Sequence, residues 1–182
     1  MEKPTKGGVR ITGVPISRLD ERQLAEFRQK HLGFVFQSYN LLPNLNAIEN
    51  VAMPLMFRGV PKRKRETIAR AMLKRVGLGK RMNHYPTQMS GGQQQRVGIA
   101  RAFVTRPQVV FADEPTGNLD SKTKTEVIDM ICSFARDFNQ TIVLVTHDDN
   151  MAQYADRIVT LLDGRIIATG LRNIHDNAYR QL

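Results

Sequence analysis

The chain has 182 residues, 41% of them hydrophobic and 24% charged, which argues against an intrinsically disordered protein. The longest clear apolar run, residues 142–145, is far too short to span a bilayer. A single cysteine, Cys132, excludes a disulfide framework and fits a reducing cytoplasm. The net charge of +10 favours anionic partners: a nucleotide, a nucleic acid or a membrane surface.

The first third of the chain predicts a strand, a helix and a second strand. Residues 7–13 are a short run bounded by glycines, which is typical of a strand. Residues 19–31 have a helical pattern, with Leu24 and Phe27 on one side. Residues 33–37 then predict a strand that ends in a polar residue.

Two helices are expected in the next segment. Residues 41–59 predict a loop and then a helix that is capped by Asn46 and interrupted near Pro54. Residues 61–76 predict a helix that stops at Gly77. Its basic first turns, "PKRKRE", are interpreted as a solvated surface, with a nucleic-acid or targeting patch as the alternative.

The second half alternates helices and strands. Ser90 and Gln93 match a capping box, so a helix is expected at about 91–104. Residues 109–113 and 141–147 predict buried strands that end in polar groups, on either side of a helix over 121–138. Residues 157–170 predict a hairpin around Asp163-Gly164. This alternation indicates an α/β fold with a mainly parallel sheet.

Four polar residues follow these strands and are candidates for phosphate chemistry. Asp113 could hold Mg²⁺, and Glu114 could orient or deprotonate a water that attacks a γ-phosphate. His147 could contact that phosphate, and Gln37 could reach a metal-bound water. Taken singly, each could instead be an ordinary solvated residue at the end of a strand.

The stretch "MSGGQ" begins the helix at 91–104. The Ser90 hydroxyl and the free amides of Gly91, Gly92 and Gln93 could bind an anion at the helix N-terminus. An ordinary capping box is the alternative interpretation. Two glycines in a first turn cost helix stability, which favours a close approach to the backbone there.

The order of these motifs resembles the ATP-binding subunit of ABC transporters. The segments "GFVFQSYNLLPNLNAIENV", "SGGQ", "VVFADEP", "DEPTGNLDS" and "VTH" carry the resemblance, most closely to the lipoprotein-release and macrolide-export branch. It assigns Gln37 to the Q-loop, residues 89–93 to the signature motif, Asp113 to the Walker B metal site and Glu114 to catalysis. Asp120 would lie in the D-loop and help to bind nucleotide, and His147 would be the switch histidine. The implied cofactors are ATP and Mg²⁺.

The resemblance implies a P-loop NTPase-like sheet flanked by helices, with a helical subdomain, in one incomplete domain over residues 1–182. Residues 1–40 would end the N-terminal core part, residues 41–89 would form the helical subdomain, and residues 90–182 would carry the remaining motifs. The family's N-terminal antiparallel sheet and its P-loop strand and helix would be largely absent.

The sequence contains no P-loop of the pattern G-x-x-x-x-G-K-[ST]. Its one Gly-Lys pair, Gly79-Lys80, has Lys74 where the first glycine should be and Arg81 where Ser or Thr should be. We therefore expect that the beginning of the domain is missing, through truncation, a wrongly assigned start or a frameshift. We expect poor stability or aggregation, because apolar surfaces would lose their cover.

Three functional hypotheses follow. The first is an ATPase subunit that couples hydrolysis to transport through a separate membrane-spanning subunit, at the cytoplasmic face of the cell membrane. In the resembling family two ATP-binding subunits pack head to tail, and the signature of one caps the ATP of the other. The second hypothesis is thus a non-catalytic partner that supplies a signature half-site or merely binds a membrane subunit. The third is a nucleic-acid module, suggested by the charge of +10 but not expected.

Overall fold

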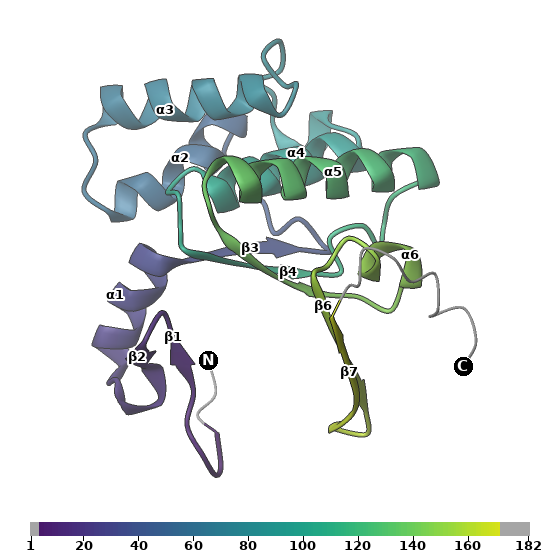
Figure 1. Cartoon of the computed structure of the whole chain (residues 1–182). Helices are drawn as coiled ribbons and strands as arrows, with labels where there is room; N and C mark the ends of the chain where they lie inside the picture. Colours follow the sequence, from purple (N-terminus) through teal and green to yellow (C-terminus); the bar gives the residue numbers. More distant parts are fainter. Residues whose placement is uncertain (1–3, 172–182) are drawn as a thin grey trace.

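A computed structural model describes residues 4–171 of the chain. Its centre is a parallel sheet of three strands in the order β3-β4-β5: β3 (Leu32–Phe36), β4 (Val109–Asp113) and β5 (Thr141–Val145) (Figure 1). Helices connect the strands along the chain. The predicted α/β class with a mainly parallel sheet is therefore confirmed.

One face of this sheet is on the helical side of the molecule (Figure 1). The helices on this side are α2 (Ala47–Phe57), α3 (Lys62–Arg75), α4 (Gly91–Phe103) and α5 (Ser121–Asp137), with α3 packed outside α2 and α4. Their apolar sides form one core with alternate strand residues, among them Val35, Val110 and Ala112. The period of two along each strand sends these side chains to the helical face.

The other face of the sheet is covered only in part. Helix α1 (Glu21–His31) begins at Asp20, whose side chain accepts a hydrogen bond from the Gln23 amide, and it buries Leu24 and Phe27 against Leu32 and Val109. This second cluster reaches β3 and β4, whereas Val143 and Val145 on β5 are exposed. The expectation that 141–147 is a buried strand is therefore right for one face only: Ile142 and Leu144 pack against the main core, but the second cluster does not reach Val143 and Val145.

Two antiparallel hairpins complete the strands. The predicted strand over 7–13 is instead a tight hairpin of β1 (Arg10–Ile11) and β2 (Val14–Pro15). Thr12 and Gly13 both have positive φ, the backbone of a two-residue turn, so the run cannot continue as one strand. The hairpin of β6 (Arg157–Leu162) and β7 (Arg165–Leu171) turns at Asp163-Gly164, as predicted.

Helix α2 differs from the prediction at Pro54. Asn46 caps the helix as expected, and Glu49 completes a capping box. The helix continues through Pro54, which removes only one backbone donor, and it is held by the burial of Val51 and Leu55. The remaining short elements are η1 (Ile16–Arg18), η2 (Pro86–Gln88) and α6 (Asp149–Ala152). No helix within residues 4–171 has the length and hydropathy needed to cross a membrane.

Candidate functional site

The site lies where the three parallel strands end. The last residues of β3, β4 and β5 are register partners, so the residues that follow them are neighbours at one edge of the sheet. Gln37 follows β3, and His147 comes two residues after β5. Asp113 closes β4 and Glu114 follows it. The fold thus places these four predicted residues at the same edge of the sheet, where open α/β sheets bind ligands.

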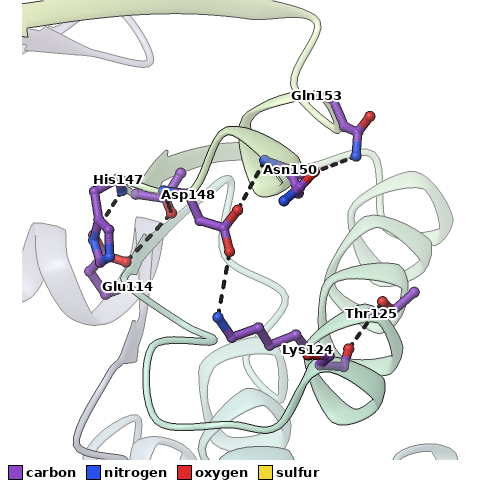
Figure 2. Close-up of polar contacts among 9 residues, drawn as sticks. Glu114, Lys124, Thr125, His147, Asp148, Asn150 and Gln153 are labelled. Atoms are coloured by element: carbon purple, nitrogen blue, oxygen red, sulfur yellow. Dashed lines mark hydrogen bonds and ion pairs between the residues drawn. The ribbon is translucent and has the colours of Figure 1, made fainter.

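Glu114 and His147 are in direct contact (Figure 2). The backbone amide of His147 donates to Oε1 of Glu114 at 3.0 Å, and its ring Nδ1 lies 2.6 Å from the same oxygen. Because a carboxylate only accepts, Nδ1 carries the proton in this contact, and Nε2 is left for another partner. The Glu114 side chain is 19% exposed, whereas that of His147 is 84% exposed. A held carboxylate and an accessible imidazole thus lie side by side.

Gln37 is fixed from the loop after β4. Its side-chain nitrogen donates to Asn118 at 3.4 Å, and Asn118 donates back to the Gln37 carbonyl at 3.3 Å. A Cβ on Gly117 would lie 2.6 Å from that nitrogen, so a larger residue there would require the Gln37 side chain to shift. The strand ends of β3 and β4 are therefore coupled through their loops.

The metal assignment rests on Asp113 and Gln37. Asp113 is exposed at the end of β4, and the described residues contain no cluster of three or more His, Cys, Asp or Glu that could hold an ion. Mg²⁺ is commonly bound through one or two protein oxygens together with phosphates and waters. Asp113 and the Gln37 amide oxygen fit that donor set, and the ion would supply neutralisation of phosphate charge.

The predicted signature residues begin α4 as expected. Ser90 caps the helix, its hydroxyl accepting from the Gln93 amide at 3.4 Å, and the Gln93 side chain accepts from the Ser90 amide at 3.2 Å. A Cβ on Gly91 would lie 2.7 Å from the Tyr39 hydroxyl, and one on Gly92 would lie 2.8 Å from Thr123 Cγ2. Side chains of this chain therefore approach both glycines closely.

Asp120 caps helix α5. Its carboxylate accepts hydrogen bonds from the Thr123 hydroxyl at 2.6 Å and the Thr123 amide at 3.0 Å. These two bonds, the hydroxyl first, lower the pKa of Asp120. Since Gly92 approaches the same threonine, the start of α4 and the segment around Asp120 are neighbours.

Some supporting residues gave no clear signal in the sequence. Arg101 on α4 donates to the carbonyls of Tyr39 and Asn40, which both have positive φ, and so fixes the loop that follows Gln37. Thr146 lies 3.4 Å from Glu114 through its hydroxyl. The position of Thr146 between an apolar strand and His147 in the sequence could have indicated that it lies close to Glu114.

Helix α5 is tied to the segment after His147. Lys124 Nζ lies 3.5 Å from the Asp148 carboxylate, which also accepts from the Asn150 amide (Figure 2). Taken together, the site defines a class: an α/β domain with an acid pair, an amide and an imidazole at one sheet edge, and a capped helix N-terminus beside it. These groups suit the binding and hydrolysis of a nucleotide phosphate.

Comparison with known proteins identifies the family. Residues 1–117 match the ABC transporter family. An uncharacterized ABC transporter ATP-binding protein of Thermotoga maritima is 49% identical over 166 residues, which are 91% of this chain and 70% of that protein. The lipoprotein-releasing system ATP-binding protein LolD of Geobacter metallireducens is 47% identical, over 92% of this chain and 75% of that protein. The chain belongs to the ABC transporter family, as its resemblance to the ATP-binding subunits implied.

Two further similarities extend this result. The macrolide export ATP-binding/permease protein MacB of Salmonella choleraesuis is 46% identical over 92% of this chain, which corresponds to 26% of that protein. Among solved structures, the ATP-binding cassette MJ0796, as a dimer in a post-hydrolysis state bound to ADP and Pi, matches with a TM-score of 0.85 at 40% identity. The match covers 93% of this chain and 75% of that chain. The family binds ATP with Mg²⁺ and hydrolyses it.

Proposed function

We propose that this chain is the ATP-binding subunit of an ABC transporter and couples ATP hydrolysis to transport through a separate membrane-spanning subunit. The observation that supports this most is the contact between Glu114 and His147 at the carboxyl ends of β4 and β5. In the proposed roles Glu114 orients or deprotonates the attacking water and His147 contacts the γ-phosphate. Gln37 and Asp113 hold Mg²⁺.

The proposed subunit acts in a head-to-tail pair with a second ATP-binding subunit. The 182 residues contain no lysine loop to hold the β- and γ-phosphates, so we propose that this chain alone does not hydrolyse ATP efficiently. A phosphate held by the partner then binds to Ser90, Gly91, Gly92 and Gln93 of this chain, and Asp120 lies beside them. The dimeric structure of the similar cassette MJ0796 supports such a pair.

An apolar groove offers a surface for the proposed membrane subunit. The groove, of about 300 Å³, lies between α2, the end of β3 and α4, and its wall includes Phe36, Met53 and Phe57. Phe57 is 58% exposed, an unusual position for so large an apolar side chain. We propose that a segment of the membrane subunit packs here, at the cytoplasmic face, and the name of the similar protein MacB, an ATP-binding/permease protein, supports a permease partner.

One observation favours a second candidate function, a non-catalytic half-site partner. The signature helix is fully capped although the sequence has no P-loop. Such a chain would complete the ATP site of another subunit and perform no hydrolysis at its own strand ends.

Association in the presence of ATP tests the head-to-tail pair. The partner is a P-loop-bearing ATP-binding subunit of the lipoprotein-releasing type whose catalytic carboxylate has been removed, so that ATP persists. Light scattering should detect a complex of the two chains only with Mg²⁺ and ATP. Ser90→Asp should abolish it, because aspartate caps a helix as well as serine but repels a phosphate.

Thr67→Asp is the matched control, since it makes the same charge change on the exposed side of α3. It should leave the complex intact. If the complex forms equally with Ser90→Asp, the signature residues do not face a partner's phosphate. If no complex forms with the unaltered chain, the head-to-tail pair is wrong.

A further inference from the structure

A cavity lined by cationic side chains lies beside the first turns of α4, on the helical side of the molecule. It has a volume of about 840 Å³ and lies among the C-terminal end of α3, the loop over 77–84 and α4. Its polar lining side chains are Lys74, Lys80, Arg81, His84, Gln93 and Arg96. The ATP chemistry proposed above uses none of these residues except Gln93. The six residues define what we call the basic cavity.

The positive charge of the basic cavity is largely uncompensated. Its lining contains no Asp or Glu. Within residues 4–171, Lys74, Lys80 and Arg81 form no ion pair. Only Arg96 is neutralised, by a contact of 2.6 Å with Glu126. Three cations that share one cavity repel one another, so an anion between them would be favourable.

The loop that carries these cations is held in place by its backbone. Gly77 ends α3 with φ of 77°, and the Leu78 amide donates to the Leu73 carbonyl at 2.8 Å. Leu78 and Met82 are buried in the main core, on either side of the exposed Lys80 and Arg81. The bases of the cationic side chains are therefore fixed, which lowers the entropy cost of binding.

The loop is also tied to helix α2. The amides of Ala47 and Ile48 donate to the carbonyls of His84 and Met82 at 3.0 and 3.1 Å. Across the cavity, Gln93 and Arg96 are three residues apart on α4 and thus lie on one side of that helix. The cavity walls thus come from structured segments.

We propose that the basic cavity binds an anion that carries phosphate groups, either free in solution or on a lipid headgroup. The volume lies within the range of small-ligand sites. Arg81 offers a planar fork of donors that matches phosphate oxygens, and Lys74 and Lys80 add compact positive charges. His84 and Gln93 add polar groups to the lining. This binding needs neither a second subunit nor ATP, so its failure and the failure of the proposed function can be told apart.

Calorimetric titration of the full chain with inorganic pyrophosphate, without ATP or partner, tests the proposal. The unaltered chain should bind pyrophosphate, and Lys80→Gln with Arg81→Gln should weaken binding by about tenfold or more, since two charged contacts are lost. Arg63→Gln with Lys64→Gln is the matched control. It removes the same two charges from the exposed first turn of α3, outside the cavity, and should bind as the unaltered chain does.

A second titration separates the two sources of phosphate. Vesicles of phosphatidylglycerol and phosphatidylcholine in equal parts present phosphate on a lipid headgroup. One outcome would identify the lipid headgroup as the source of the phosphate. In that outcome the chain does not bind pyrophosphate, and the Lys80/Arg81 variant loses vesicle binding while the Arg63/Lys64 variant keeps it. Equal loss in both variant pairs would mean that net charge alone attracts anions, and this would overturn the proposal. Binding of neither probe would overturn it too.

Discussion

Glu114 adopts a left-handed backbone conformation, with φ of 43°, at the point where the chain leaves β4. Its amide still donates to the Val145 carbonyl at 2.9 Å, so the bond to β5 continues past the strand end while the chain turns. Non-glycine residues rarely adopt this conformation, and the strain is often found at functional positions. The strained backbone and the contact with His147 together fix the carboxylate.

Substitution of Glu114 reveals this strain. Glu114→Ala and Glu114→Gly both delete the carboxylate, but only glycine adopts positive φ without cost. We expect the glycine variant to be more stable than the alanine variant by about 1 kcal/mol. Urea unfolding followed by circular dichroism at low protein concentration measures the difference. An alanine variant as stable as the glycine variant would mean that the backbone is unstrained.

Gly92 is explained by the methyl group of Thr123, 2.8 Å from where a Cβ would lie. Gly92→Ala should therefore gain helix propensity but lose as much or more through overpacking. In a Thr123→Ser background the methyl group is absent and the hydroxyl that binds Asp120 remains. In that background the change in unfolding free energy caused by Gly92→Ala should be more favourable by about 1 kcal/mol than in the unaltered chain. Equal effects in both backgrounds, measured by urea unfolding, would refute the packing explanation.

Asp120 should make stability depend on pH. Its hydrogen bonds from Thr123 lower the pKa in the folded chain. The contribution to stability is therefore complete above the pKa of the unfolded state, about 4, and is lost as pH falls through the lower folded pKa. We expect the unaltered chain to have a higher free energy of unfolding than the Asp120→Asn variant at neutral pH. This difference should disappear in acid. A difference that is constant with pH would contradict this assignment.

At the scale of elements, β5 and the β6–β7 hairpin expose apolar surface. Val145 is 54% exposed on the open side of the sheet, and Ile166 and Leu171 are 66% and 70% exposed on the hairpin. Figure 1 shows this hairpin extending away from the helices and the central sheet. An unpaired strand edge with apolar residues is a template for association.

A charge on β5 should therefore improve solubility. Val143→Lys places a lysine on the exposed side of the edge strand, and we expect a larger monomeric fraction in size-exclusion chromatography. Ile142→Lys is the control, because Ile142 packs against the main core and its substitution should reduce the soluble yield. A soluble monomer with a cooperative thermal transition, in the unaltered chain, would contradict the expected aggregation.

The sequence predicted the elements well where the local signals were strong. Asn46 and Ser90 cap helices as expected, and Asp163-Gly164 turns the hairpin. The helix continues through Pro54 against the prediction, because burial of the surrounding helix outweighs one missing hydrogen bond. The apolar pattern of β5 predicts burial on both faces, but the pattern does not reveal which faces of a sheet other elements cover.

At the scale of the whole molecule, strand order determines which predicted site residues meet. Parallel strands brought Gln37, Glu114 and His147 to one edge, which the sequence could indicate because each follows an apolar run. The contact between Glu114 and His147 joins residues that are 33 positions apart in the chain. The hydrogen bonds of Arg101 to the loop after Gln37 span about 60 positions. No local pattern predicts such contacts.

In the proposed head-to-tail pair, Ser90 to Gln93 complete an ATP site whose P-loop belongs to another chain. The decisive measurement is phosphate release from ATP in the presence of Mg²⁺, by this chain mixed with a P-loop-bearing subunit whose own signature serine has been replaced by aspartate. We predict no release by this chain alone, clear release by the mixture, and loss of that release with Ser90→Asp but not with Thr67→Asp. Release by the mixture no faster than by the partner alone, or efficient release by this chain alone, would contradict the claim.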